Sequence, residues 1–399
     1  MLRKHLLYIL KVAIIAIIYF FAARFGLGFD PVSGFATLVW PPTGIAIAAI
    51  ILLGIEFWPG VFLGAFFANW ATGAVIPVAI GIGTGNMLEA VFATFFLRQF
   101  SGFKNAIQNT RHAVGFIFFG ALVSTMVSAT IGVTSLFLGG VVMDLSAYWA
   151  TWQAWYVGDA LGALILTPLI LAWFNFFREQ YTTKVKLGKL VEAGALVLVI
   201  LTVSLLIFGR VIPDGARAAA ITYILFVPVI WGALRFNTLG SVTASFILSA
   251  VAIWATSAGA GPFFHGNVSE SLFYLQIFVG ILSATALILA TNVAERKVKE
   301  KLITEMNEKL EQRVIERTGE LRRSEAKLAE YAKGLETMVA DRTKELEEKV
   351  DDLEKLNKFM VGRELKMIEL KEEVHNQHVK LEELREKLPV KKAKPALKN

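Results

Sequence analysis

Long apolar stretches fill the first three quarters of the chain, and a heptad pattern of apolar residues follows them. A membrane-spanning helix needs about 20 mostly apolar residues. Ten segments approach this length, namely residues 5–25, 36–54, 57–72, 74–97, 112–138, 148–174, 188–209, 217–235, 238–258 and 271–294. The third is short enough to be a re-entrant or strongly tilted helix. The pattern predicts an all-α fold, a polytopic transmembrane bundle of about eight to ten spans.

Beyond residue 294 the apolar residues adopt an alternating spacing of four and three, which is the seam of a coiled coil. The seam positions are Leu310, Val314, Arg317, Leu321, Ser324, Leu328, Tyr331 and Leu335. Val339 then follows Leu335 by four residues where three is due, and such a stutter locally unwinds a supercoil. The same slip appears as a repeat, because residues 310–321 recur 25 residues later as residues 335–346. We expect this helix to pair with a second copy of the chain.

Composition supports a division of the chain near residue 294. Only 18% of the residues are charged, against about 25% in soluble domains. Residues 295–399 nevertheless hold 26 of the 40 Lys and Arg and 24 of the 33 Asp and Glu. We therefore expect an integral-membrane sensory domain (residues 1–294), a long cytoplasmic coiled coil (295–388) and a disordered basic tail (389–399).

Lys and Arg between the spans indicate the orientation, because they are enriched in cytoplasmic loops. With the N-terminus inside, the inner segments carry Arg3, Lys4, Arg98, Lys104, Arg111, Arg178, Lys184, Lys186, Lys189 and Arg235, and the outer loops carry Arg24, Arg210 and Arg217. This bias predicts a multi-pass protein of a bacterial-type inner membrane with both termini in the cytoplasm. It also explains the basic pI without a nucleic-acid partner, and we interpret the first span as an uncleaved helix.

The sequence shows none of the motifs that mark common catalytic sites. The chain has no Cys, which excludes a disulfide, a thiolate nucleophile and a cysteine-ligated metal. His375 and His378 lie three residues apart but have no third metal ligand, and the 21 residues after His378 are too few for a kinase domain. No phosphate-binding Gly-rich loop is present. The sequence predicts no enzyme activity, catalytic residue, metal or cofactor.

Two ionisable residues, Glu89 and Asp159, lie well inside expected spans, where a charged side chain is costly and by default suggests a function. Asn86 precedes Glu89 by one helical turn, and Trp155 precedes Asp159 by one turn. Each carboxyl group is either a buried polar tie between helices or a ligand or proton site at the centre of the bundle.

Prolines and glycines mark the ends and contacts of the expected helices. Trp40, Pro41 and Pro42 open the second span, where two prolines fit a first helical turn; the alternative is a ligand contact at the membrane rim. Three G-x-x-x-G pairs predict close packing of helices. They are Gly60 and Gly64, Gly81 and Gly85, and Gly158 and Gly162.

Four stretches, residues 39–46, 58–69, 85–90 and 155–168, together resemble the membrane-associated sensor (MASE) domain of the first type. The resemblance covers residues 10–294 and implies an integral-membrane sensory input unit, of about eight spans, that precedes a histidine kinase or another output enzyme. The candidate ligand- or signal-sensing residues in these stretches are Trp40, Pro41, Pro42, Asn69, Asn86, Glu89, Trp155 and Asp159. The repeated coil sequence is similar to the signalling linker of sensor histidine kinases.

Three functions fit these observations. The first is a sensor in contact with the lipid bilayer that signals through a homodimeric coil to a separate partner such as a kinase. The second is a transporter or permease, in which Glu89 and Asp159 carry protons or ions and the coil only oligomerises the chain. The third is a truncated or split sensor histidine kinase.

Overall fold

The computed structural model describes residues 2–28, 37–180, 187–209, 221–264 and 268–387, and all regular elements in these ranges are helical. The all-α prediction is confirmed. The elements are α1 (Leu2–Gly26), α2 (Pro41–Leu53), η1 (Ile55–Phe57), α3 (Trp58–Ala71), α4 (Ile76–Ser101), α5 (Thr110–Gly115), η2 (Phe116–Val123), α6 (Ser124–Leu138), α7 (Leu145–Gln180), α8 (Leu187–Phe208), η3 (Thr222–Leu225), α10 (Phe226–Ser257) and α11 (Val268–Glu386). The chain forms two compact units, Met1–Ile303 and Thr304–Asn399.

Seven helices in the described ranges are long and apolar enough to cross a membrane. Two of the ten expected spans, the second and the third, are shorter than a membrane crossing requires. The expected second and third spans are α2 and α3, with 13 and 14 residues. At 1.5 Å per residue each rises about 20 Å, short of the roughly 30 Å hydrocarbon core.

The expected eighth and ninth spans both have residues within the range of α10. The backbone of α10 leaves helical geometry at Asn237, where φ is 55° and ψ is −142°. A straight helix would separate Gly232 and Gly240 by about 12 Å, yet a Cβ on Gly232 would lie 2.8 Å from the Gly240 carbonyl oxygen. The chain thus folds back at Asn237, which confirms the predicted break between residues 235 and 238. Residues 217–220 of the expected eighth span lie outside the described residues.

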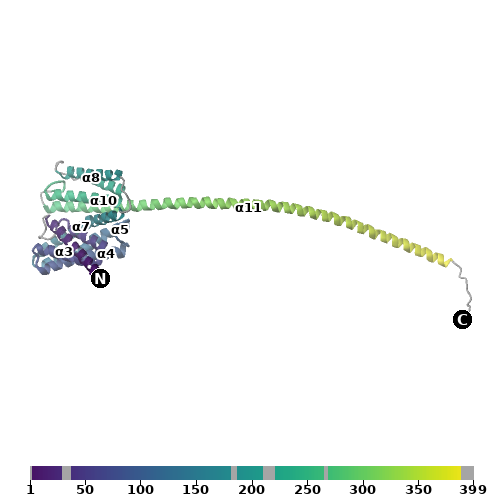
Figure 1. The fold of residues 1–399 in the computed structure, drawn as a ribbon, viewed down its shortest axis with the longest axis horizontal. Helices are drawn as coiled ribbons and strands as arrows, with labels where there is room; N and C mark the ends of the chain where they lie inside the picture. The colour runs from purple at the N-terminus through teal and green to yellow at the C-terminus, as the bar shows by residue number, and fades with distance from the viewer. Residues whose placement is uncertain (1, 29–36, 181–186, 210–220, 265–267, 388–399) are drawn as a thin grey trace, which may run out of the picture. The chain divides into compact units, whose positions relative to one another are not determined.

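The helices of the first unit pack on both sides of α7, which lies between α3 and α4 on one side and α8 and α10 on the other (Figure 1). One buried cluster joins α7 to α1–α4 through Ala163 and Leu164. Another joins α7 to α8, α10 and α11 through Leu161 and Ile165. Because α7 is apolar on both faces, it is the central helix of the bundle.

All three G-x-x-x-G pairs lie at helix–helix contacts, which confirms the packing prediction. Gly60 and Gly64 face α1 and Gly81 faces α6, with no room for a Cβ. Gly85 also faces α6, where a Cβ would lie 3.2 Å from Ile131. Gly158 lies against the backbone that precedes α2. These contacts bring the polar residues of separate helices within hydrogen-bonding distance.

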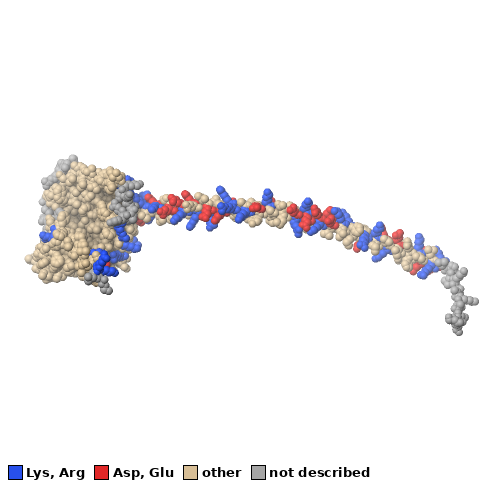
Figure 2. Space-filling view, viewed as in Figure 1, with Lys and Arg blue, Asp and Glu red and all other residues tan. Residues whose placement is uncertain are grey.

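The second unit consists of the continuation of α11, a helix of 119 residues. Its seam residues Leu310, Leu321 and Leu328 are 54–65% exposed in the single chain. Charges of both signs follow one another along it (Figure 2). Equivalent ion pairs mark the repeat, because Arg317 contacts Glu320 and Arg342 contacts Glu345. Pairing of this helix with another chain stays a prediction.

Candidate functional site

The segment that leads into α2 lies directly on α7, because glycines leave space for it. The Trp40 amide donates to the Gly158 carbonyl oxygen at 2.9 Å. A Cβ on Gly162 would lie 2.0 Å from the Trp40 carbonyl oxygen, so only glycine fits there. This contact places Thr43, in the first turn of α2, against Asp159, which lies between the two glycines of α7.

Thr43 joins the two carboxyl groups that the sequence singled out. Its Oγ1 lies 3.2 Å from Glu89 Oε2 and 3.0 Å from Asp159 Oδ1. Each of the three residues is only 1% exposed. A hydroxyl group has one hydrogen to donate, so it can donate to only one of these carboxyl groups at a time. The other bond forms when the second carboxyl group is protonated and donates to Thr43. Two buried carboxylates would also repel each other, and both arguments indicate a site that holds at least one proton.

A second set of hydrogen bonds surrounds the carboxyl groups on the α1 side. The Tyr19 hydroxyl donates to Asn86 Oδ1 at 2.9 Å and accepts from Trp40 Nε1 at 3.4 Å. Asn86 Nδ2 donates to the Ile82 carbonyl oxygen at 2.9 Å within α4. Tyr19 is fully buried, so α1, α2 and α4 are tied together by polar groups inside an apolar bundle.

The α6 side of the site is formed by Ser128 and Trp155. Trp155 Nε1 donates to Ser128 Oγ at 3.2 Å, and the Ser128 side chain lies beside both carboxyl groups. Within the described part of the chain, Glu89 Oε1 and Asp159 Oδ2 are buried without a hydrogen bond. These two oxygen atoms are therefore the acceptors available to a proton or a small cation.

Most predicted site residues meet at this centre. Trp40, Asn86, Glu89, Trp155 and Asp159 contribute side chains to it. Pro41 and Pro42 form the first turn of α2, as predicted, and thereby position Thr43. Asn69 does not join, because its Nδ2 donates to the Ala65 carbonyl oxygen of its own helix at 2.8 Å. The proposed sensing role of these residues stays a prediction.

Sequence reasoning missed Tyr19, Thr43 and Ser128 as site residues. The only sequence feature that could have indicated Thr43 as a site residue is its place in the Trp-Pro-Pro-Thr-Gly stretch. Ser and Thr are common in these helices, and several bond to their own backbone, as Thr94 does to Ala90. Only the packing of α2 on α7 distinguishes Thr43 from such residues.

A helical bundle that crosses the bilayer several times and encloses a polar centre defines a multi-pass membrane protein with an internal site. A family model, MASE1, matches residues 11–297. The chain therefore belongs to the MASE1 family, whose domain is a membrane sensor without catalytic function. Comparisons with curated proteins and with solved structures gave no match.

The family match ends before the heptad repeat begins at Leu310. The likeness of the coil to histidine-kinase linkers therefore stays a prediction. Among the described residues, no three His, Asp or Glu side chains gather where they could hold a metal ion.

Proposed function

We propose that this protein is a membrane signal-input unit in which the Thr43–Glu89–Asp159 centre senses a proton or small cation. Binding there changes how α2, α4 and α7 pack. The change passes along α11 to a separate output partner, such as a kinase, in the cytoplasm.

One observation carries this proposal. α11 begins as an apolar bundle helix and continues without interruption to Glu386. Its buried residues Leu282, Ala286 and Leu287 belong to the clusters that also contain α7. A shift of α7 would therefore displace the α11 residues that pack in the same clusters. An unbroken helix transmits rotation or translation along its axis.

The coil has the features of a paired helix. Its apolar seam is exposed in the single chain, and burial of such a seam against a second copy is the usual source of coiled-coil stability. We place the domain boundary at residues 294–295 and both termini in the cytoplasm of a bacterial-type inner membrane. Lys184, Lys186, Arg210 and Arg217, which enter the charge bias, lie outside the described residues.

Insertions into α11 test the transmission. A kinase core with a measurable output is fused after Lys387, and helix-forming residues are inserted between Ile303 and Thr304. Seven inserted residues restore the heptad phase, whereas four rotate the coil relative to the bundle. We expect the four-residue insertion to change kinase output severalfold and the seven-residue insertion to retain it. Equal output from both would mean that the coil is only a tether.

The buried carboxyl pair also fits a proton-coupled transporter. In that case proteoliposomes that contain the purified protein should take up protons under an imposed gradient, and Asp159→Asn should abolish the uptake. A sensor should show no net flux in either form, because its site binds without releasing the ion to the other side.

A further inference from the structure

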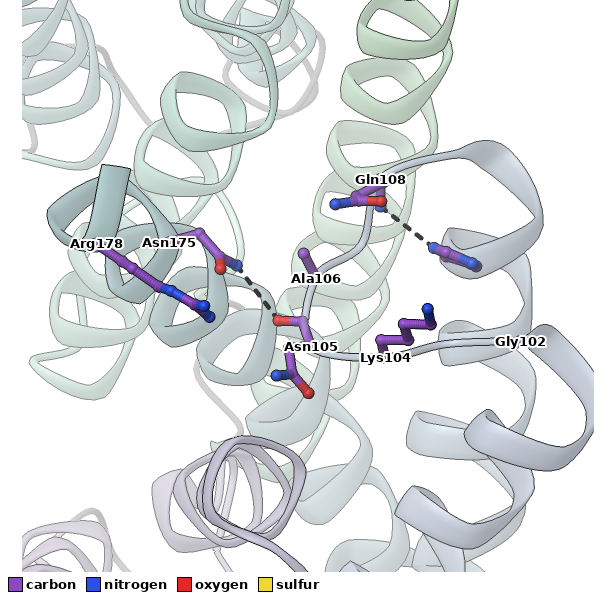
Figure 3. Close-up of a pocket in the computed structure, with 8 residues that line it drawn as sticks. Gly102, Lys104, Asn105, Ala106, Gln108, Asn175 and Arg178 are labelled. Atoms are coloured by element: carbon purple, nitrogen blue, oxygen red, sulfur yellow. Dashed lines mark hydrogen bonds between the residues drawn. The ribbon is translucent and has the colours of Figure 1, made fainter. Parts of the chain in front are cut away.

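A separate basic pocket lies where the loop between α4 and α5 meets the last turns of α7 (Figure 3). Its volume is about 530 Å³, within the range of roughly 300–1,000 Å³ that is typical of small-ligand sites. The side chains that matter for its chemistry are Lys104, Asn105, Gln108, His112, Asn175 and Arg178. No Asp or Glu is among the described residues that line it.

The loop is held in place by its apolar residues. Gly102 ends α4 in the left-handed conformation, with φ of 66°. Phe103 and Ile107 are then 2% and 6% exposed, within the cluster that contains α1–α4. Lys104 and Asn105, which lie between these two anchors, are exposed on the pocket side.

Hydrogen bonds fix the two walls of the pocket. Asn175 Nδ2, on α7, donates to the backbone carbonyl oxygen of Asn105 at 3.3 Å. The backbone N–H of Gln108 donates to His112 Nδ1 at 3.4 Å. Figure 3 shows Arg178 and Asn175 reaching from α7 toward the loop. The pocket is therefore built by two separate parts of the bundle.

The charge of this pocket suits an anion. Lys104 and Arg178 each bring a full positive charge, and Arg is well shaped to bind phosphate oxygens. The C-terminal ends of α4 and α7 are negative and would repel an anion, but each carries only about half a negative charge. Lys104 and Arg178 outweigh the two helix ends.

A larger apolar cavity adjoins the pocket. Its volume is about 1680 Å³, and it shares Ala106, Gln108 and Asn175 with the basic pocket. Most of its wall is apolar, with Leu171 of α7 and Ile200 of α8 as examples. A polar pocket that shares a wall with an apolar cavity among membrane helices matches a ligand with a charged head and a hydrocarbon tail.

We propose that the pocket and cavity together bind an anionic phospholipid. Its phosphate lies between Lys104 and Arg178, and its acyl chains enter the cavity between α7, α8 and α10. A soluble phosphate compound would satisfy only the pocket and would leave the apolar cavity without a partner. The bilayer around the bundle supplies such lipids at high local concentration.

The same loop contacts α11, which gives the lipid a route to the coil. The Thr110 amide and hydroxyl both donate to Glu295 Oε2 at 3.2 Å, and Glu295 pairs with Lys299 at 2.8 Å. Glu295 and Lys299 also line the cavity. This regulatory consequence rests on the proposed function, whereas lipid binding itself does not.

Native mass spectrometry tests the binding. The purified full chain is first reconstituted in nanodiscs of phosphatidylcholine with about a quarter phosphatidylglycerol. We expect phosphatidylglycerol to be retained in preference to phosphatidylcholine. Lys104→Gln with Arg178→Gln should weaken retention by roughly thirtyfold, since each cation near an anionic headgroup contributes about 1 kcal/mol. The matched control is Arg3→Gln with Lys4→Gln, which removes the same charge from exposed N-terminal residues and should retain the lipid.

A second pair of variants tests the apolar cavity. Gly194 lines the cavity, and a Cβ there would meet no atom within 4 Å. Gly194→Phe should therefore occupy part of the cavity and weaken acyl-chain binding. Gly188→Phe is the control on the same helix, equally open but outside the cavity. Equal retention of both lipids by the wild-type chain would overturn the proposal. So would tight binding of inorganic phosphate that Gly194→Phe leaves unchanged, because the pocket would then be a free-phosphate site.

Discussion

Thr43 is the residue through which the two buried carboxyl groups interact, and its single hydroxyl hydrogen limits how they can be charged. The hydroxyl donates to Glu89 or to Asp159 and accepts a hydrogen bond from the other carboxyl group when that group is protonated. Transfer of the proton from one carboxyl group to the other would reverse the direction of these two hydrogen bonds, and its loss would break one of them. Because Thr43 lies on α2 and the carboxyl groups on α4 and α7, such a reversal would act on three helices at once.

Asp159→Asn separates a sensing role from a structural one. The amide retains the shape and can donate to Thr43 or Glu89. We therefore expect membrane abundance to stay the same and the free energy of unfolding to change by less than about 1 kcal/mol. The output of the kinase fusion should nevertheless become locked, since Asp159 no longer exchanges a proton and the proton cannot move between the two carboxyl groups. The measurements are thermal unfolding in detergent and fusion activity.

Asp159→Leu is the control for that experiment. It removes both the charge and the hydrogen-bonding oxygens, and it leaves the buried Thr43 hydroxyl with one hydrogen-bond partner fewer. We expect it to cost about 1–3 kcal/mol for each unsatisfied group. Normal, regulated output from the Asn variant would mean that Asp159 only ties helices together.

Residues of the centre differ in how far the sequence could predict them. Glu89 and Asp159 stood out because charged side chains are rare and costly inside apolar segments. Tyr19 and Ser128 did not, because uncharged polar residues are tolerated throughout such helices. Asn69 lies apart from the centre, because its side chain turns back to Ala65, which nothing in the sequence shows; its sensing role stays a prediction.

At the scale of helices, the apolar runs in the sequence located all seven long apolar helices of the described residues. They did not predict how short α2 and α3 are. The run over residues 36–54 includes non-helical residues before Pro41, so α2 is shorter than its apolar stretch. The reversal of α10 at Asn237 was predicted from a short polar interruption between two apolar runs. The contacts between helices depend on small residues, which the sequence marks clearly as G-x-x-x-G pairs.

Gly162→Ala tests whether the contact of α2 with α7 builds the site. The added Cβ would lie 2.0 Å from the Trp40 carbonyl oxygen, so the helices must separate. We expect a loss of about 1–3 kcal/mol in the free energy of unfolding, together with altered output because Thr43 moves away from Asp159. Gly194→Ala is the matched control, since its Cβ meets no atom within 4 Å. Equal stability of the two variants would argue against the close contact.

At the scale of the whole molecule, a membrane bundle with a buried carboxyl pair continues into a long helix whose heptad phase slips once. Without the stutter, Met338 would follow Leu335 in the seam by three residues; with it, Val339 takes that place. Both side chains are exposed in the single chain. Two nearly equivalent packings of a paired helix are a suitable basis for a switch, because a small movement of the bundle can select between them.

Disulfide cross-linking across the stutter tests this coupling most directly. The chain contains no Cys, so single Met338→Cys and Val339→Cys variants report pairing without background, with the seam variant Leu328→Cys and the outward-facing Ala326→Cys as positive and negative controls. The ratio of cross-linked dimer from Met338→Cys to that from Val339→Cys is measured in native membranes, with and without Asp159→Asn. The account predicts a severalfold change in this ratio when Asp159 is replaced. An unchanged ratio, with Leu328→Cys still forming dimers, would contradict it.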